Sequence, residues 1–524
     1  MRIGLLALLV FAQTLVAATS RPNFLWISAE DISPDLHCYG DEASISPNID
    51  RLAAQGVRFT RAFSTAPVCA PSRSSIISGM YSSSVGSHNM RSDVIPPANI
   101  RCFTEYLRAA GYFCTNNAKT DYNFTVPATA WDENGPHAHW RDRESPDQPF
   151  FAVFNLMETH ESRAMNLNGQ FTHLTDKLSP SEKHDPAKLK LPVYYPDTPI
   201  VRASWARWYD CITVMDKRVG ELLDQLDKDG LADNTVVFFW GDHGRCMPRG
   251  KRWVYDSGLR VPLVVRWPGS IAPNSVRDDL TTLMDLGPTL LSIAGIKEPT
   301  YFQGRALLGS AQQPPPPYVF ATRDRMDEVY DMMRSVRDER FRYIRNFEPE
   351  KPYAQPLTYM DHSPLMQEWR RLASEGKLTG APALFFAPHK PVEELYDEQD
   401  DPDEVHNLAD DPSYQSRLAT MRAATIRWME QIDDKGLIPE PAGSPTTRPD
   451  RVHPKVLPPL ATLKDGQVAL QSMTAGSSIA YQIGPATKHW KLYVTPVELR
   501  TGQTLRAKGC RAGFVESDTI SIHE

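Results

Sequence analysis

Short apolar runs alternate with amphipathic segments along the first half of the chain. Four runs are continuously apolar and rich in Val, Ile, Phe and Trp, which is typical of strands buried on both faces of a parallel sheet. They are Asn23–Ser28, Tyr112–Cys114, Phe150–Leu156 and Thr235–Trp240, and a further strand is predicted at Pro262–Trp267. Polar residues follow each of the four runs directly, so chemically capable side chains are expected at the strand ends.

Helical patterns lie between these runs. One helix is predicted from Ser46-Pro47 to just before Gly56, and a long amphipathic helix from Ser204–Leu226, with apolar residues at three- and four-residue spacing, ends near Gly230. Alternating strands and helices predict an α/β fold whose large, mostly parallel sheet is flanked by helices.

The pattern changes after residues 314–317, which are four consecutive prolines. Met333–Phe347 predicts two short strands around a polar turn, and Tyr414–Asp433 predicts a helix, so a smaller second unit is expected over residues 314–436. The arginines of Met333–Phe347 are expected on a solvated strand face, and contact with an acidic sugar is the alternative.

A third unit follows a linker. Residues 437–460 contain seven prolines and little apolar periodicity, which favours a semi-rigid linker. Alternating runs over residues 461–524 predict a small β-sandwich, which resembles the short module at the end of chitobiase-like carbohydrate enzymes. We expect this module to serve packing rather than sugar binding.

Composition narrows the function classes. The 524 residues carry a net charge of −7 without long blocks of like charge, which disfavours a nucleic-acid partner.

Residues 1–18 have a short positive start, an apolar core and small residues at the end, which is typical of a secretory signal peptide. No other stretch is apolar enough to cross a bilayer, so we expect an exported protein, periplasmic or secreted, with no integral membrane segment. The oligomeric state is left open.

Ser64–Ile77 carries the most specific motif of the chain. Pro71 and Ser72 are helix-start signals, which place Cys69 just ahead of a helix N-terminus. Free backbone N–H groups and the helix dipole are expected there to favour an anion and to lower the pKa of the thiol. Arg73 can offer a planar fork of donors to a tetrahedral oxyanion at the same point. A buried structural cysteine is the alternative.

The seven cysteines are an odd number, so in an exported protein at least one lacks an intramolecular partner, and a modified Cys69 would account for it.

Carboxylates follow two of the predicted strands. Glu30 and Asp31 come after the first, and Asp242 and His243 come after Thr235–Trp240. A single Asp after a strand often only caps a helix, but parallel strands bring their carboxyl ends to one edge, where ligands bind. Three carboxylates and one imidazole suit calcium or magnesium better than zinc. The sequence has no Cys-x-x-Cys pair or His-Glu-x-x-His motif that would argue for zinc.

The Cys-x-Pro-Ser-Arg string at Cys69 resembles the signature of the type I sulfatases, and the resemblance extends over residues 21–410. It implies an alkaline-phosphatase-like sandwich, with a catalytic domain at 21–313 and an antiparallel C-terminal subdomain at 314–436. It also implies that a formylglycine-generating maturation enzyme oxidises Cys69, and that the hydrated aldehyde attacks sulfur. The implied ligands of one calcium ion are Glu30, Asp31, Cys69, Asp242 and His243.

The resemblance extends to further site residues. It implies that Lys119 and Lys251 neutralise the sulfate and that His160 protonates the leaving group. Three positions depart from the common family pattern: Glu30 stands in place of Asp, His243 in place of Asn, and Asp121 in place of a second histidine. We assign no role to Asp121.

The substrate class also follows from resemblance. Ser28–Asp31, Pro192–Arg202 and Arg334–Arg337 look most similar to the N-sulfoglucosamine sulfohydrolase branch, which implies hydrolysis of the N-sulfate of glucosamine in heparan or heparin fragments. An O-sulfatase acting on a glycosaminoglycan or another sulfated polysaccharide is the near alternative. A phosphomonoesterase or phosphonate hydrolase, and an inactive carbohydrate-binding protein of the same fold, are the alternatives from other classes.

Overall fold

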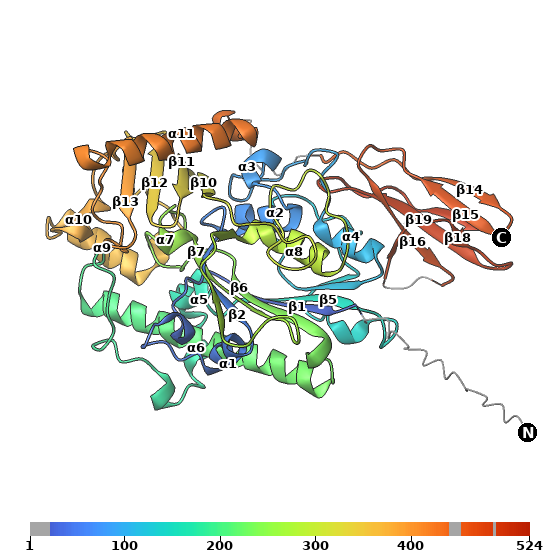
Figure 1. Cartoon of the computed structure of the whole chain (residues 1–524), viewed down its shortest axis with the longest axis horizontal. Coiled ribbons are helices and arrows are strands. Elements are labelled where there is room, and N and C mark those ends of the chain that lie inside the picture. The colour runs from blue at the N-terminus through green and yellow to red at the C-terminus, as the bar shows by residue number, and fades with distance from the viewer. Residues whose placement is uncertain (1–20, 440–451, 486–488) are drawn as a thin grey trace, which may run out of the picture.

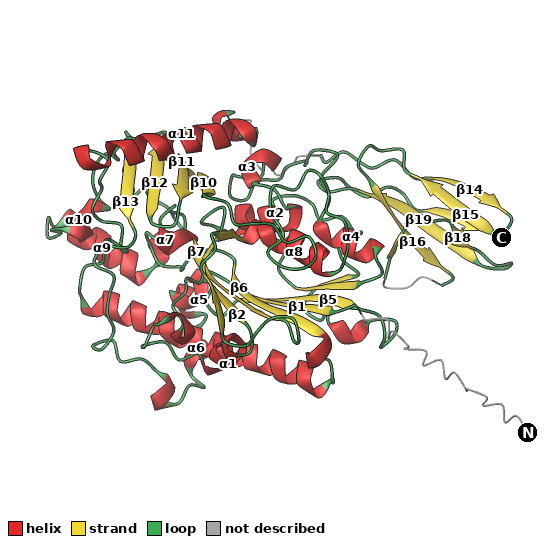
Figure 2. Ribbon diagram, in the orientation of Figure 1, coloured by secondary structure: helices red, strands yellow, loops and turns green. Residues whose placement is uncertain are grey.

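The computed structural model describes residues 21–439, 452–485 and 489–524 (Figure 1). A nine-stranded sheet lies at its centre, in the order β4-β3-β5-β1-β6-β7-β2-β8, with β9 paired to β2. Figure 2 shows this sheet between two layers of helices. Its strands are β1 (Asn23–Ala29), β2 (Val57–Phe63), β3 (Phe113–Asn117), β4 (Glu133–Asn134), β5 (Phe150–Leu156), β6 (Thr235–Gly241), β7 (Arg260–Arg266), β8 (Ser275–Arg277) and β9 (Thr281–Thr282).

The four continuously apolar runs form one parallel block, β3-β5-β1-β6. Ile27 of β1 lies between Phe154 of β5 and Phe239 of β6, and all seven residues of β1 are buried. β7 is antiparallel to both of its neighbours, so the sheet is mostly parallel, as predicted. The block therefore gathers the carboxyl ends of four strands at one edge.

Helices cover both faces of the sheet. α1 (Pro47–Ala54) and α6 (Pro199–Lys228) pack on one face, and α2 (Cys69–Ser78), α4 (Phe103–Ala109) and α8 (Leu286–Ile293) pack on the other (Figure 1). α6 begins earlier than the predicted Ser204, because Thr198 caps it and Pro199 occupies its first turn. The remaining α-helices are α3 (Ser82–Val85), α5 (Glu161–Ala164), α7 (Asp256–Leu259), α9 (Pro364–Ser374), α10 (Ala381–Leu384) and α11 (Gln415–Gln431).

A second, antiparallel sheet follows the large sheet along the chain. It has the order β10-β11-β12-β13, and α11 packs on it through a small core that includes Val336, Leu395 and Met421. Two strands around a polar turn and a closing helix were predicted here, and both are present. The strands are β10 (Val319–Met326), β11 (Val329–Arg337), β12 (Phe341–Asn346) and β13 (Glu393–Asp397).

Three arginines of this sheet contradict the predicted solvated face, because Arg334, Arg337 and Arg342 are all buried. Arg334 lies between Asp324, at 3.0 Å from Nη2, and Asp434, at 2.6 Å from Nε. Arg342 pairs with Asp256 of α7. Carboxylates of the neighbouring strand β10, of α7 and of the segment after α11 neutralise these arginines, so the arginines stabilise the packing of the second sheet and are not available to an acidic sugar.

The C-terminal residues form two further antiparallel sheets around a separate small core. This module contacts the unit built on the large sheet directly: Arg108 Nη2 donates to Trp490 O at 2.6 Å, and Gly513 N donates to Thr125 O at 2.9 Å. Ala512 belongs to the core on one face of the large sheet. The strands are β14 (Leu460–Lys464), β15 (Gln467–Gln471) and β18 (Val497–Glu498) in one sheet, and β17 (Lys491–Leu492), β16 (Ser478–Ile483), β19 (Thr504–Cys510) and β20 (Ile520–His523) in the other.

Two predicted segments fall wholly or partly outside the described residues. The predicted signal peptide, residues 1–18, lies outside them, as does most of the predicted linker. Among the helices that the structure describes, none has both the length and the apolar character needed to span a bilayer. The domain boundaries remain predictions.

Candidate active site

The carboxyl edge of the parallel block gathers the predicted site residues. Glu30, Asp31, Asp242 and His243 are all fully buried. One potential ligand atom each from Asp31, Cys69, Asp242 and His243 lies within 4.8 Å of the others, and the same holds for a second set. That second set is Glu30, Asp31, Cys69 and His160. The strand-end pattern of the sequence therefore becomes one cluster in space.

Cys69 is the first residue of α2, so this helix begins before the predicted start signals. Its Sγ lies 3.4 Å from His243 Nε2, 3.5 Å from Lys251 Nζ and 3.6 Å from Glu30 Oε2. The predicted lowering of the thiol pKa is wrong. Burial raises the pKa of Cys69 well above its usual value, and the nearby carboxylates add to this effect against the lowering by Lys119 and Lys251.

The carboxylate cluster fits a hard cation. His243 Nδ1 lies 2.9 Å from Gly244 O, which can only accept, so the ring proton is on Nδ1 and the lone pair of Nε2 faces the cluster. Nε2 is 2.9 Å from Asp31 Oδ1. Two acceptors at this separation need a cation or a proton between them. Asp242 Oδ1 in turn accepts from the backbone N of Asp31, which ties the β1 and β6 ends together at 2.9 Å.

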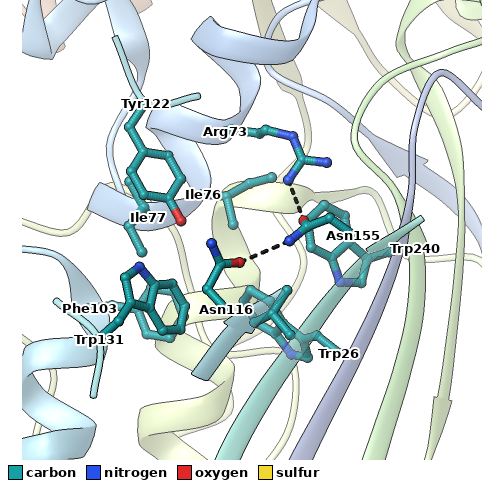
Figure 3. Close-up of a pocket in the computed structure, with 11 residues that line it drawn as sticks. Trp26, Arg73, Ile76, Ile77, Phe103, Asn116, Tyr122, Trp131, Asn155 and Trp240 are labelled. Atoms are coloured by element: carbon teal, nitrogen blue, oxygen red, sulfur yellow. Dashed lines mark hydrogen bonds between the residues drawn. The ribbon is translucent and has the colours of Figure 1, made fainter. Parts of the chain in front are cut away.

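Arg73 joins three of the strand ends through one guanidinium. It contacts Glu30 through Nη2, Asp242 through Nε at 3.2 Å and Asn155 of β5 through Nη1 at 2.7 Å. Figure 3 shows Asn155 between Arg73 and Asn116 of β3, to which it donates at 2.9 Å. Burial of Glu30 would raise the pKa of its carboxyl, but Arg73 and Lys119 together hold it well below the usual value.

Lys119 lies on the more open side of the cluster. Its Nζ is 2.5 Å from Glu30 Oε2 and 3.6 Å from Asp121 Oδ2, and its side chain is 19% exposed. Asp121, which replaces the second histidine of the family pattern, therefore lies at the site and faces a cation.

A second layer of charges, which was not predicted from the sequence, holds Lys251. Its Nζ lies 2.8 Å from Asp31 and 3.0 Å from Glu161. Arg252 clamps the same Glu161 with two contacts of 2.8 and 2.9 Å. Burial would raise the pKa of Glu161, but Arg252 and Lys251 lower it to about 2. Glu161 could have been noticed only as an acid in the first turn of α5, where helix capping explains it equally well.

His160 caps α5 at the edge of the cluster. Its Nδ1 accepts from Ser162 N at 3.3 Å, which leaves the proton on Nε2. Burial lowers the pKa of His160, and the neighbouring Lys251 lowers it further.

The aromatic cavity in Figure 3 is lined by neither Cys69 nor the carboxylates of the cluster. Its volume is about 20 Å³, and it is lined mainly by apolar groups, among them Trp26, Phe103 and Trp240. Arg73 and Asn155 also line it, so this cavity lies on the sheet side of the arginine. It is a packing space beneath the site.

Comparison with known proteins identifies the family. The family model described as Sulfatase matches residues 22–124 and 138–296. An ulvan-active sulfatase of Formosa agariphila is 39% identical, over 96% of this chain and 91% of the relative. The chain belongs to the sulfatase family. This sulfatase is a hydrolase of sulfate esters or sulfamates that acts on sulfated carbohydrates, as the sequence predicted.

Two further comparisons support this assignment. A model described as N-sulphoglucosamine sulphohydrolase, C-terminal, matches residues 241–353 of the sulfatase, and human N-sulphoglucosamine sulphohydrolase is 27% identical over 79% of this chain and 91% of the relative. A putative sulfatase from Bacteroides thetaiotaomicron shares the fold, with a TM-score of 0.59 and 21% identity over 82% of this chain and 96% of that chain. Sulfatases generally use formylglycine and a metal ion, and the buried carboxylate cluster offers such a metal site.

Proposed function

We propose that this sulfatase hydrolyses sulfate esters of an ulvan-type polysaccharide with a formylglycine formed from Cys69. The observation that carries the catalytic part is the position of Cys69 Sγ, within 3.6 Å of Glu30, His243 and Lys251. A formylglycine hydroxyl at the position of this sulfur would lie beside the metal site. It would also lie beside Lys251, whose charge would face the sulfate. The ulvan-active relative, which is similar over nearly the whole chain, supports the substrate class.

Removal of the N-sulfate of glucosamine is the second candidate. The match of residues 241–353 to the C-terminal model of N-sulphoglucosamine sulphohydrolase supports it, as does the similarity to the human enzyme. The difference lies in the leaving group, which is an alcohol in the first case and an amine in the second.

The metal that fits the cluster is calcium. Glu30, Asp31, Asp242 and His243, with the group at Cys69, would hold it, and carboxylate-rich sites of this kind favour hard divalent cations. When bound, calcium polarises a sulfate oxygen and favours ionisation of the hydroxyl that attacks sulfur.

The protein's own cations and one imidazole carry the remaining chemistry. Arg73 orients the group at Cys69 through its fixed contacts with Glu30 and Asp242. Lys119 and Lys251 neutralise the charge that develops on the sulfate oxygens. In its imidazolium form, with Nδ1–H donating to Ser162 Oγ at 2.9 Å, His160 delivers the Nε2 proton to the leaving oxygen or nitrogen as its bond to sulfur breaks. The second hydroxyl of the formylglycine then loses its proton and re-forms the aldehyde, which breaks the C–O bond to the sulfate and releases it, and water rehydrates the aldehyde.

Maturation and export complete the proposal. Residues 1–18 direct the chain out of the cytoplasm to the periplasm or beyond, and a formylglycine-generating enzyme converts Cys69. The other proposed partner is the sulfated polysaccharide itself.

The deciding experiment measures sulfate release in the presence of calcium by protein whose formylglycine has been confirmed by peptide mass spectrometry. The substrates are ulvan oligosaccharides, N-sulfoglucosamine and N-acetylglucosamine 6-sulfate, with the Cys69→Ala variant as the blank. Release from ulvan alone supports the first candidate, and release from N-sulfoglucosamine alone supports the second. Hydrolysis of a phosphate ester or phosphonate without sulfate release would move the protein to the phosphatase class. Binding of these sugars without any hydrolysis would indicate an inactive carbohydrate-binding protein.

A further inference from the structure

A continuous row of alternating charges runs from Asp31, whose Oδ1 is 3.9 Å from Cys69 Sγ, to the protein surface. Its first contact joins Asp31 to Lys251 at 2.8 Å, and Glu161 then links Lys251 to Arg252. Beyond Arg252, the row continues through Asp327, at 3.5 Å, to an exposed arginine. The members are Asp31, Lys251, Glu161, Arg252, Asp327 and Arg91.

Four members of this row have a left-handed backbone. The φ angles are +53° at Asp31, +80° at Arg252, +49° at Asp327 and +56° at Arg91. Aspartate tolerates this conformation, but arginine adopts it rarely, and such strain tends to gather at functional sites. The surrounding hydrogen bonds hold the outer pair in place: Met90 N donates to Arg325 O at 2.8 Å, next to both Arg91 and the turn that carries Asp327.

Arg91 differs from the inner members in its exposure. Its side chain is 53% exposed, whereas that of Asp327 is 10% and that of Arg252 is 3% exposed. The Arg91 Nε lies 3.1 Å from Asp327 Oδ1. Its two terminal nitrogens have no hydrogen-bond partner in the part of the chain that the structure describes. The guanidinium is therefore paired on one side with a buried carboxylate oxygen that has no hydrogen-bond partner of its own among the described residues, and its two terminal nitrogens remain open.

We propose that Arg91 binds a second anionic group of the substrate, a carboxylate or another sulfate, on the sugar next to the one that loses its sulfate. This inference rests on the proposed function. It follows because two ion pairs, Arg252–Asp327 and Asp327–Arg91, continue the row from Arg252, the chain neighbour of Lys251, to the surface. The exposed guanidinium of Arg91 is thus the outer end of the row of charges that begins beside the lysine proposed for the sulfate. A planar fork matches both carboxylate and sulfate geometry. Asp327 acts as a positioning residue, since its ion pair with Nε leaves the terminal nitrogens to the ligand.

The test measures binding apart from turnover. In a Cys69→Ala background, calorimetry compares the Kd for ulvan oligosaccharides with and without Arg91→Asn, because asparagine keeps the left-handed backbone but removes the charge. We expect Kd to rise about 10- to 100-fold, the usual weight of a hydrogen-bonded charge. Arg91→Lys should recover part of the affinity, since it keeps the charge without the fork. Arg500→Asn, which removes a 76% exposed arginine of the C-terminal module, is the matched control and should leave Kd unchanged.

Two further arms identify the anion and separate the two hypotheses. Oligosaccharides treated to amidate their carboxyl groups should lose the Arg91 effect if a carboxylate is bound, and partly desulfated ones should lose it if a sulfate is bound. In active protein, the loss should appear in KM rather than kcat and should shrink with added salt. Equal Kd values for the Arg91 and Arg500 variants, with tight binding by both, would overturn the role of Arg91. No sulfate release by the Cys69 protein from any substrate would instead overturn the proposed function, whatever the binding shows.

Discussion

Glu161 is the residue whose replacement tests the charge network most directly. In Glu161→Gln the side chain keeps its size but loses the charge that pairs with both Lys251 and Arg252. Those two cations are 2% and 3% exposed, so water cannot replace the lost partner.

The lowered pKa of Glu161 and the usual cost of breaking a buried ion pair predict a similar loss in the free energy of unfolding. Folding lowers the pKa of Glu161 from 4.5 to about 2. A tenfold change in an equilibrium constant corresponds to about 1.4 kcal/mol, so the folded protein favours the ionised carboxylate by about 3 kcal/mol. Removing one partner of a buried ion pair usually costs about 3–5 kcal/mol. We therefore expect Glu161→Gln to lower the free energy of unfolding by about 3–5 kcal/mol. Because Lys251 then keeps one of its two carboxylate partners, Asp31, kcat/KM should fall about 10- to 100-fold.

The assay combines urea denaturation with sulfate release by the folded variant. Glu375→Gln is the matched control, because Glu375 also pairs with two cations, Arg371 and Lys377, but at the surface of α9. Its unfolding midpoint and activity should match those of the wild type. Wild-type stability and wild-type activity in the Glu161 variant as well would refute this role of the buried network.

Three further predictions concern the metal, the arginine fork and pH. Calcium should raise the Tm of the Cys69→Ala protein and chelation should lower it, while Asp242→Asn should abolish the shift; an unchanged Tm would argue against the metal site. Arg73→Lys should lower kcat/KM by at least about 100-fold, because an ammonium group cannot contact Glu30, Asp242 and Asn155 together; steady-state kinetics on folded protein would show it. Burial raises the pKa of Glu404 from 4.5 to about 7 against the lowering by Arg342. Between pH 4.5 and about pH 7 the folded state therefore binds a proton that the unfolded state has already released. Stability should thus fall by about 2–3 kcal/mol from pH 5 to pH 8, and Glu404→Gln should flatten the profile; a parallel profile would contradict the assignment.

The part of the site that the sequence predicted is the part that lies at strand ends. Glu30, Asp31, Asp242 and His243 each follow a continuously apolar run, and a parallel sheet brings such ends together whatever the details of packing. The Cys69 string was specific enough to identify the family by resemblance. The apolar runs predicted the parallel sheet and the cluster at its edge, and the Cys69 string predicted the family.

The missed residues lie where local sequence has a simpler explanation. Asn155 is inside a strand, and its role depends on the neighbouring β3 and on Arg73. Arg334 and Arg342 looked solvated because Asp434 and Asp256, which pair with them, lie 100 and 86 residues away in the chain. The third partner, Asp324, faces Arg334 only through the pairing of the two strands. The predicted direction of the thiol pKa was wrong for the same reason, since the helix dipole is local but the burial and the carboxylates are not.

The burial of α2 sets an order of events for the newly made chain. All ten residues of this helix are buried, and Cys69 is only 2% exposed. A second enzyme cannot reach this thiol once the strands have closed around it. The conversion that the proposed function requires therefore has a time window, which opens at synthesis and closes at folding. Protein that folds before its maturation enzyme arrives would keep the thiol permanently, so yield of active enzyme should depend on the relative rates of the two processes, and slower folding should favour activity.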